Sequence, residues 1–190
     1  DRRRHGGNVE KEAVGRALLT AAYLEGDFVL RSGKRSRYYL DKYLFETDPQ
    51  VLRGIVGEMA MMIRNELATG AAYQRLAAPE LGGVVLGTGL SLELGLPLLL
   101  VRKAAKEYGT TKRIEGRFEA GEKVALVEDI VTSAGAAIQA AEALREAGVV
   151  VDDLFCVVDR EEGGAEAARG SGLTLRALFT SSELGIVPAP

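Results

Sequence analysis

Two adjacent carboxylates, Glu128 and Asp129, follow the apolar run 124–127 and precede a turn of small residues. That turn, 132–136, reads Thr-Ser-Ala-Gly-Ala, and its backbone N–H groups would form an anion cradle where a helix begins. Carboxylates suit ribose hydroxyls and backbone amides suit phosphate, so the pattern favours a sugar phosphate ligand. The alternative is structural, because Thr132 and Ser133 could cap the helix while the small residues only allow close packing.

A basic segment, residues 102–117, holds six basic residues and two acidic ones. Such a run is commonly a solvated face. This one directly follows the apolar run 98–101 and contains Gly109 and Gly116 as candidate hinges. We therefore also consider it as a functional loop at the sheet edge where the anion cradle is expected.

Alternating strand and helix patterns must position these groups. We expect an Asn8 N-cap on the first helix and an Asp48-Pro49 start on the second. This alternation predicts an α/β fold with a parallel sheet flanked by helices on both faces, and a small N-terminal hood over its carboxyl edge. The expected helices are about 9–25, 49–67, 84–97, 135–147 and 165–169, and the expected strands are 28–30, 38–41, 75–78, 98–101, 123–128, 151–158 and 173–179.

Length and composition limit the classes of protein to consider. A chain of 190 residues, 47% hydrophobic and 27% charged, fits one globular domain, with about 1–45 as hood, 46–183 as core and 184–190 as tail. A net charge of −3 gives no support to a nucleic-acid surface. The single cysteine, Cys156, lies in an apolar run and is expected to be a buried reduced thiol in a cytoplasmic protein.

No targeting or membrane segment is expected. The start of the chain lacks the apolar core of a signal peptide. Residues 84–101 are apolar, but Glu93 and Pro97 interrupt them, so we interpret them as a helix followed by a strand rather than a membrane span.

Four motifs in chain order resemble those of a known family. The 124–136 segment resembles the phosphoribosyl-pyrophosphate (PRPP) motif of type I phosphoribosyltransferases. Segment 102–110 looks like the mobile catalytic loop of the orotate phosphoribosyltransferases. Segment 28–39, with Ser-Gly-Lys at its centre, and segment 159–163, Asp-Arg-Glu-Glu-Gly, resemble two further motifs of that family.

The resemblance implies transfer of the 5-phosphoribosyl group from PRPP to orotate, which gives orotidine 5′-phosphate and pyrophosphate in pyrimidine biosynthesis. It also implies Mg²⁺ as cofactor, held by substrate oxygens rather than by a protein cage. Breaking the anomeric bond builds positive charge on ribose and negative charge on pyrophosphate, and both must be stabilised in a dry site.

By the family pattern, Glu128 and Asp129 hold the ribose hydroxyls and the 132–136 turn binds the 5-phosphate. The loop cations neutralise pyrophosphate, and Lys103, Lys106 and Asp129 are implied as catalytic. The full set implied for PRPP is Arg102, Lys103, Lys106, Tyr108, Glu128, Asp129, Ile130, Val131, Thr132, Ser133, Ala134, Gly135 and Ala136.

For orotate, the resemblance implies Arg160 as the partner of the carboxylate, because a guanidinium binds it through two parallel hydrogen bonds. Arg31 and Tyr39 would line the base pocket from the hood, and Thr132 would contact the ring. The alternatives are a surface ion pair of Arg160 with the glutamates at 161–162, and core packing of Tyr39.

The family's usual homodimer, in which loop 102–116 reaches the neighbouring site, is also implied. Segment 79–83 resembles the family's pyrophosphate-contacting segment, or it is a plain strand-to-helix turn.

Several positions depart from the family pattern. Tyr108 stands where many members have His, and Arg31 where Lys is common. Ala134 replaces a frequent Gly, and Ala136 replaces a frequent Ser or Thr, so one hydroxyl contact to phosphate is lost. The other functions considered are transfer to a purine or another base, a non-catalytic regulator that senses PRPP or a nucleotide, and a nucleotide-binding protein without transfer activity.

Overall fold

The computed structural model describes residues 2–29, 33, 35–103 and 113–186. Strands and helices alternate along these residues. Their bounds are α1 (Arg2–Ala22), β1 (Tyr23–Val29), β2 (Arg35–Leu40), α2 (Lys42–Glu46), α3 (Pro49–Ala68), β3 (Arg75–Pro79), α4 (Gly82–Leu94), β4 (Leu98–Val101), β5 (Ile114–Glu115), β6 (Lys123–Val131), α5 (Gly135–Glu146), β7 (Val150–Asp159), α6 (Gly164–Gly170) and β8 (Thr174–Thr180).

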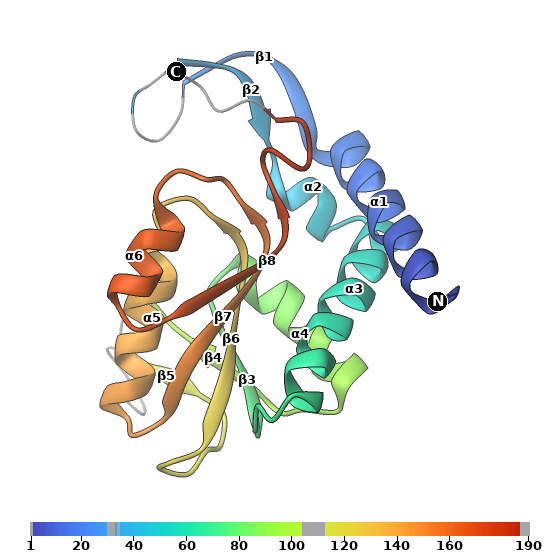
Figure 1. Cartoon of the computed structure of the whole chain (residues 1–190). Helices are drawn as coiled ribbons and strands as arrows, with labels where there is room; N and C mark the ends of the chain where they lie inside the picture. The colour runs from blue at the N-terminus through green and yellow to red at the C-terminus, as the bar shows by residue number, and fades with distance from the viewer. Residues whose placement is uncertain (1, 30–32, 34, 104–112, 187–190) are drawn as a thin grey trace.

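The central sheet has the order β5-β4-β3-β6-β7-β8. Its pairs are parallel except β4 with β5, and β1 and β2 form a separate antiparallel hairpin. Helices α1, α3 and α4 lie on one side of the sheet and α5 and α6 on the other (Figure 1). The expected α/β fold with a parallel sheet flanked by helices is confirmed.

Both faces of the sheet are buried. On β6, Ala125 and Val127 belong to the core under α3 and α4, whereas Val124 and Leu126 belong to the core under α5. This period of two, with every residue apolar, is what a strand covered on both sides requires. The near-continuous apolar runs of the sequence therefore become the central strands.

The start of α3 follows its sequence closely. Asp48 is the N-cap, and its carboxylate accepts hydrogen bonds from the backbone N–H of Gln50 at 2.9 Å and Val51 at 3.1 Å. Pro49 occupies the first turn, where a missing N–H costs nothing. The predicted helix 49–67 is confirmed within one residue.

The N-terminal elements differ from the sequence-based expectation. Helix α1 begins at Arg2, so Asn8 lies inside it and is not an N-cap. It ends at Ala22 rather than near residue 25, because Tyr23–Glu25 pair with Tyr38–Leu40 across the hairpin. The tertiary pairing thus overrides the helical pattern. The hairpin lies beyond the sheet at the end where the parallel strands finish, in the place expected for the hood (Figure 1).

Helix α2 and strand β5 were not expected, and β6 is longer than expected. Ile114 and Glu115 form the short strand β5 on the edge of β4, inside the segment that we read as a loop or solvated face. Strand β6 continues to Val131 because it pairs with β7 as far as Asp159. Asp129, expected just beyond the strand, therefore lies within it together with Glu128.

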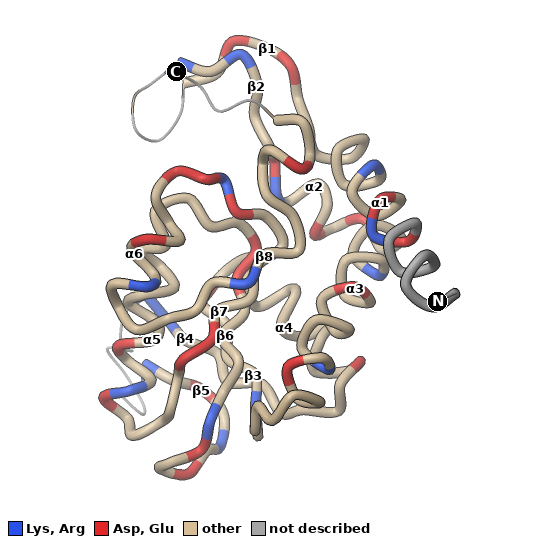
Figure 2. Tube along the Cα trace, in the orientation of Figure 1, with Lys and Arg blue, Asp and Glu red and all other residues tan. Residues whose placement is uncertain are grey.

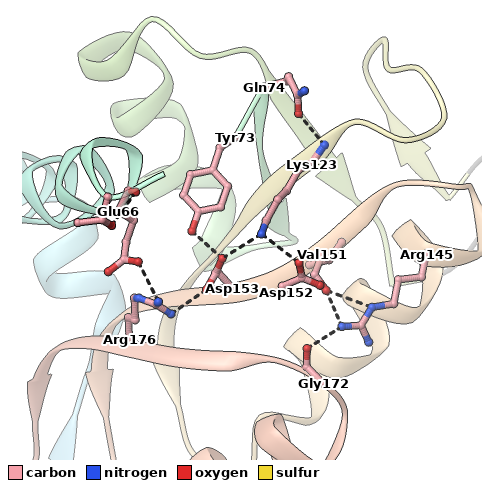
Figure 3. A network of polar contacts seen from close by, with 11 residues as sticks. Glu66, Tyr73, Gln74, Lys123, Arg145, Val151, Asp152, Asp153, Gly172 and Arg176 are labelled. Carbon is pink, nitrogen blue, oxygen red and sulfur yellow. Dashed lines mark hydrogen bonds and ion pairs between the residues drawn. The ribbon is translucent and has the colours of Figure 1, made fainter. Parts of the chain in front are cut away.

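A network of charged side chains ties the opposite end of the sheet together (Figure 3). The Tyr73 hydroxyl donates to buried Asp153 at 2.6 Å. Arg176 donates to Asp153 at 2.7 Å and to Glu66 of α3 at 2.9 Å, while Lys123 pairs with Asp152 at 3.0 Å. Helix α3 and strands β6, β7 and β8 are thereby joined far from the site described below.

Of the helices in the described part of the chain, none combines the length and apolarity that a bilayer crossing needs.

Candidate active site

An open cavity of about 510 Å³ lies at the carboxyl ends of β3 and β4, against the start of α5. It brings together turn 132–136, called the phosphate turn after its expected ligand, the start of segment 79–83, and the first cations of the basic segment. Its lining residues are Pro79, Glu80, Val101, Arg102, Lys103, Arg113, Thr132, Ser133, Gly135, Ala136, Gln139 and Ala140.

The turn presents backbone rather than a side-chain cap at the start of α5. The N-cap is Ala134, whose φ of 60° is left-handed, and no side chain caps the helix. Thr132 and Ser133 are exposed toward the cavity instead of capping α5, which counts against the purely structural alternative. The first N–H groups of a helix without such a cap, together with its dipole, favour an anion.

The basic wall of the cavity begins with Arg102 and Lys103. The Arg102 N–H donates to the carbonyl of Arg113 at 2.8 Å, and the Lys103 N–H donates to the Glu80 carboxylate at 2.7 Å. The Nε of Arg102 is buried and finds no acceptor among the described residues. Lys106, Tyr108 and Arg31 lie outside the described residues.

The paired acids lie deeper than the cavity wall. Glu128 is 8% exposed and Asp129 2% exposed, and neither lines the cavity. The Asp129 carboxylate accepts a hydrogen bond from the Lys42 ammonium at 2.6 Å. Burial, and then the charge of Asp129, raises the pKa of Glu128 well above its usual range. Lys42 was not identified from the sequence, since 87 residues separate it from Asp129.

Arg160 lies beside the PRPP motif. Its backbone N–H donates to the carbonyl of Val131 at 2.9 Å. Gly164 permits this approach, because a Cβ there would come within 2.5 Å of the Thr132 carbonyl oxygen. The candidate orotate-binding arginine and the phosphate turn therefore belong to one packed unit.

The Arg160 side chain contacts the hood. It donates to the Tyr38 hydroxyl at 3.1 Å, lies 5.4 Å from the Tyr38 ring centroid and pairs with Glu162 at 3.0 Å. The ion pair with Glu162, which was the alternative role for Arg160, is therefore formed. It does not use the whole guanidinium, because the Arg160 Nε is buried without an acceptor in the described part of the chain.

Tyr39 points to the other face of β2. It is 41% exposed and contacts Phe28, with ring centroids 5.7 Å apart, so the core-packing alternative does not apply. Tyr38, 8% exposed, is the tyrosine that meets Arg160. Successive side chains of a strand point to opposite faces, so Tyr38 and Tyr39 can be told apart once it is known which face of β2 meets the sheet.

Among the described residues, no group of three or more His, Cys, Asp and Glu side chains is arranged to hold a metal ion.

Comparison with known proteins shows the family to which the chain belongs. No family model matches it. The chain is 47% identical to the orotate phosphoribosyltransferase of Methanocella arvoryzae over 176 residues, which are 93% of this chain and 97% of that protein. The chain belongs to the orotate phosphoribosyltransferase family. Another member, from Halobacterium salinarum, is 46% identical over 84% of this chain and 87% of its own length.

Solved orotate phosphoribosyltransferases share the fold. The Mycobacterium tuberculosis enzyme in complex with PRPP superposes with a TM-score of 0.75 at 25% identity, over 93% of this chain and 99% of that one. The Aeropyrum pernix enzyme gives a TM-score of 0.76 at 27% identity, over 90% and 96%. An adenine phosphoribosyltransferase from Leishmania donovani shares the fold alone, with a TM-score of 0.67 at 16% identity over 90% and 81%.

Proposed function

We propose that the chain transfers the 5-phosphoribosyl group from PRPP to orotate and releases orotidine 5′-phosphate and pyrophosphate, as a step of pyrimidine (UMP) biosynthesis. The observation that carries this proposal is the junction of Arg160 with the phosphate turn through Val131 and Gly164. A carboxylate-binding guanidinium beside a phosphate cradle suits one anionic base next to one sugar phosphate.

The cavity supplies the PRPP-binding half of the site. Turn 132–136, with Ile130 and Val131 before it, would hold the 5-phosphate through backbone N–H groups. Arg102 and Lys103, whose position at the rim supports this role, would neutralise pyrophosphate together with Lys106 and Tyr108. The unpaired Nε of Arg102 would gain its missing acceptor from the substrate.

Glu128 and Asp129 would bind the ribose hydroxyls and stabilise the cationic sugar in the transition state. The negative field of this site acts near the end of a buried strand, where charges interact more strongly than in water, and burial raises the pKa of Glu128, so Asp129 would supply most of that field. Lys103, Lys106 and Asp129 would thus be catalytic, because they meet the two charges that separate when the anomeric bond breaks.

Orotate would lie between the hood and the 160–164 segment. Arg160 would bind its carboxylate and Thr132 its ring, while Arg31 and Tyr39 would approach from the hood. The buried Arg160 Nε supports this placement, since a bound carboxylate would satisfy it.

Mg²⁺ is proposed as the cofactor. Of the described residues that line the cavity, Glu80 carries the carboxylate, and Thr132 and Ser133 add hydroxyls. Mg²⁺ prefers oxygen ligands and binds through few carboxylates plus substrate phosphates, so this donor set fits an ion held mainly by PRPP. When bound, the ion would supply positive charge against the departing pyrophosphate.

A homodimer in which loop 102–116 reaches the neighbouring site is the proposed assembly. The base of that loop supports it, because Arg102 and Arg113 are hydrogen-bonded there at the cavity rim. The cytoplasm is the proposed location, since the buried thiol of Cys156 has no partner cysteine in the sequence.

The test measures pyrophosphate release from PRPP and Mg²⁺ with orotate, adenine, hypoxanthine and uracil supplied separately. Release with orotate alone supports the proposal. Release with another base instead would make the chain a phosphoribosyltransferase of different base specificity. PRPP binding without release for any base would indicate a regulator.

A further inference from the structure

Lys42 is the cation in contact with the PRPP motif that the family resemblance does not account for. It begins α2, which joins the hood to α3, and its ammonium lies 2.6 Å from Oδ2 of Asp129. The Asp129 side chain is 2% exposed and that of Lys42 is 32% exposed. A pair this close and largely out of water is a directed contact rather than a surface ion pair.

The other groups around Asp129 do not balance its charge. Glu128 precedes it on β6, and Glu46 ends α2 with both carboxyl oxygens buried. Burial, followed by a hydrogen bond and the charge of Asp129, raises the pKa of Glu46 to about 8. Cys156 on β7 also lies within electrostatic reach of Asp129. Among the described residues in these contacts, Lys42 is therefore the cation that pairs with Asp129.

Helix α4 closes the remaining side with backbone. A Cβ on Gly82 would lie 1.6 Å from Oδ2 of Asp129 and 2.7 Å from Oε1 of Glu46. A Cβ on Gly83 would lie 3.4 Å from Oε1 of Glu128. Glycine at both positions lets the start of α4 pack directly on the acids, so no side chain of α4 stands between them and the helix.

We propose that Lys42 is a positioning residue for Asp129: its ammonium holds the carboxylate in one orientation, ready for the ribose hydroxyls of PRPP. Asp129 Oδ1 accepts the Ile130 N–H at 2.5 Å while Oδ2 accepts Lys42. Each carboxylate oxygen has a second lone pair, so both contacts can persist when ribose binds. The inference rests on the proposed role of Asp129 in PRPP binding.

The arrangement also links the hood to the PRPP motif. The N–H of Asp41, next to Lys42, donates to the carbonyl of Ala22 at the end of α1, and the Asp41 side chain caps α2. The position of Lys42 is thereby set by the same segment that carries Tyr38 toward Arg160. Preorganised groups gain affinity because fewer rotamers are lost on binding.

The experiment compares Lys42→Met, Lys42→Gln and Lys42→Arg with the unchanged chain. It measures kcat/KM for PRPP against pH, KM for orotate, and PRPP affinity by calorimetry. We expect Lys42→Met and Lys42→Gln to lower kcat/KM for PRPP about 10- to 100-fold, the usual effect of removing a group that orients a binding residue. The acidic limb of both variants should move to higher pH, because the charge of Lys42 lowers the pKa of Glu128 and of Glu46. Lys42→Arg should restore most of the lost kcat/KM and most of the shift in the acidic limb.

Arg75→Met is the matched control. Arg75, at the start of β3, pairs with Glu122 at 2.5 Å, and both side chains are partly buried, at 19% and 18% exposed. We expect it to lower thermal stability and leave the pH profile unchanged. Lys42→Gln keeps a neutral hydrogen-bond donor on a side chain one atom shorter, so it serves if Lys42→Met does not fold.

The proposal is overturned if the charge-removing variants keep the wild-type acidic limb and PRPP affinity, or if Arg restores neither. Absence of transfer in the unchanged chain would instead contradict the proposed function, and calorimetry with PRPP would then still test Lys42.

Discussion

The Arg160 guanidinium stacks over the Tyr38 ring at 5.4 Å from its centroid and donates to the Tyr38 hydroxyl at 3.1 Å. This contact fixes the candidate orotate-binding cation against the hood. Tyr38→Phe keeps the ring and removes the acceptor, a loss of about 1 kcal/mol. We expect KM for orotate to rise roughly fivefold, the factor that corresponds to this energy, with KM for PRPP unchanged. Tyr39→Phe should have a smaller effect on KM for orotate. An equal or larger effect would indicate that Tyr39, rather than Tyr38, supports orotate binding.

Arg160 itself is expected to determine the choice of base. Arg160→Gln removes the charge that would bind the orotate carboxylate, and a charged hydrogen bond contributes about 1.5–3 kcal/mol. KM for orotate should therefore increase about 10- to 100-fold, while calorimetry finds PRPP affinity retained. Arg160→Lys should recover only part of the affinity for orotate, since an ammonium cannot form the two parallel hydrogen bonds of a guanidinium. Unchanged orotate kinetics in the Gln variant would remove Arg160 from the site.

Ala134 is strained by its left-handed φ of 60°. An L-residue with a side chain costs about 1–2 kcal/mol in this conformation, whereas glycine adopts it freely but loses more entropy on folding. We expect Ala134→Gly to raise the free energy of unfolding by up to about 1 kcal/mol, measured by urea denaturation. Ala136→Gly, inside α5, is the control and should lower it. Equal effects at both positions would contradict the strain argument.

Tyr73 contributes to stability and not to activity. Its hydroxyl bonds buried Asp153 at the end of the sheet opposite the cavity (Figure 3), and burial followed by this hydrogen bond raises the pKa of Tyr73. Tyr73→Phe leaves Asp153 with Arg176 as partner, so we expect a loss of about 1–2 kcal/mol in the free energy of unfolding. Turnover measured on the folded variant should match that of the unchanged chain; a loss of turnover would show coupling to the site.

Glu46 should make stability depend on pH. Its pKa is about 8 in the folded chain and near 4.5 when unfolded, so between these values the folded state holds the extra proton. The free energy of unfolding then falls as pH rises through this window, by at most about 1.4 kcal/mol per pH unit. Glu46→Gln removes this contribution and should flatten the slope in denaturation curves taken across the window. An unchanged slope would mean that Glu46 is ionised when folded.

The distribution of charged residues also separates the candidate site from the structural network around Asp153. In Figure 2, acidic and basic residues alternate over the loops and outer helices, whereas most of the central sheet is neutral. Charged residues within the strands include Glu128 and Asp129 near the carboxyl end of β6, and Asp153 near the start of β7. The first pair faces α2 and α4 at the candidate site, and Asp153 belongs to the structural network.

Much of the fold could be predicted from local patterns. Asp48-Pro49 marks the start of α3, and apolar runs such as 124–127 become buried strands, because cap chemistry and burial on both faces are local requirements. The end of α1 could not be predicted in this way, because the pairing of Tyr23 with Leu40 across the hairpin determines it. The roles expected for the phosphate turn, Arg102 and Lys103 came from the family resemblance, and the cavity brings these residues together.

What the sequence leaves open are contacts between distant segments. Lys42 meets Asp129 across 87 residues, and Arg160 meets Tyr38 across 122. The printed sequence contains Tyr38 and Tyr39 side by side, and only the packing of the hairpin shows which one faces Arg160. No local pattern encodes such a choice.

The central claim is tested most directly by mixing the purified chain with orotate, PRPP and Mg²⁺ and identifying the products. We expect orotidine 5′-phosphate and pyrophosphate in equal amounts, with the ultraviolet absorbance of orotate falling only when PRPP is present. If orotate remains intact while the folded chain binds PRPP, the assignment of transfer to orotate is wrong.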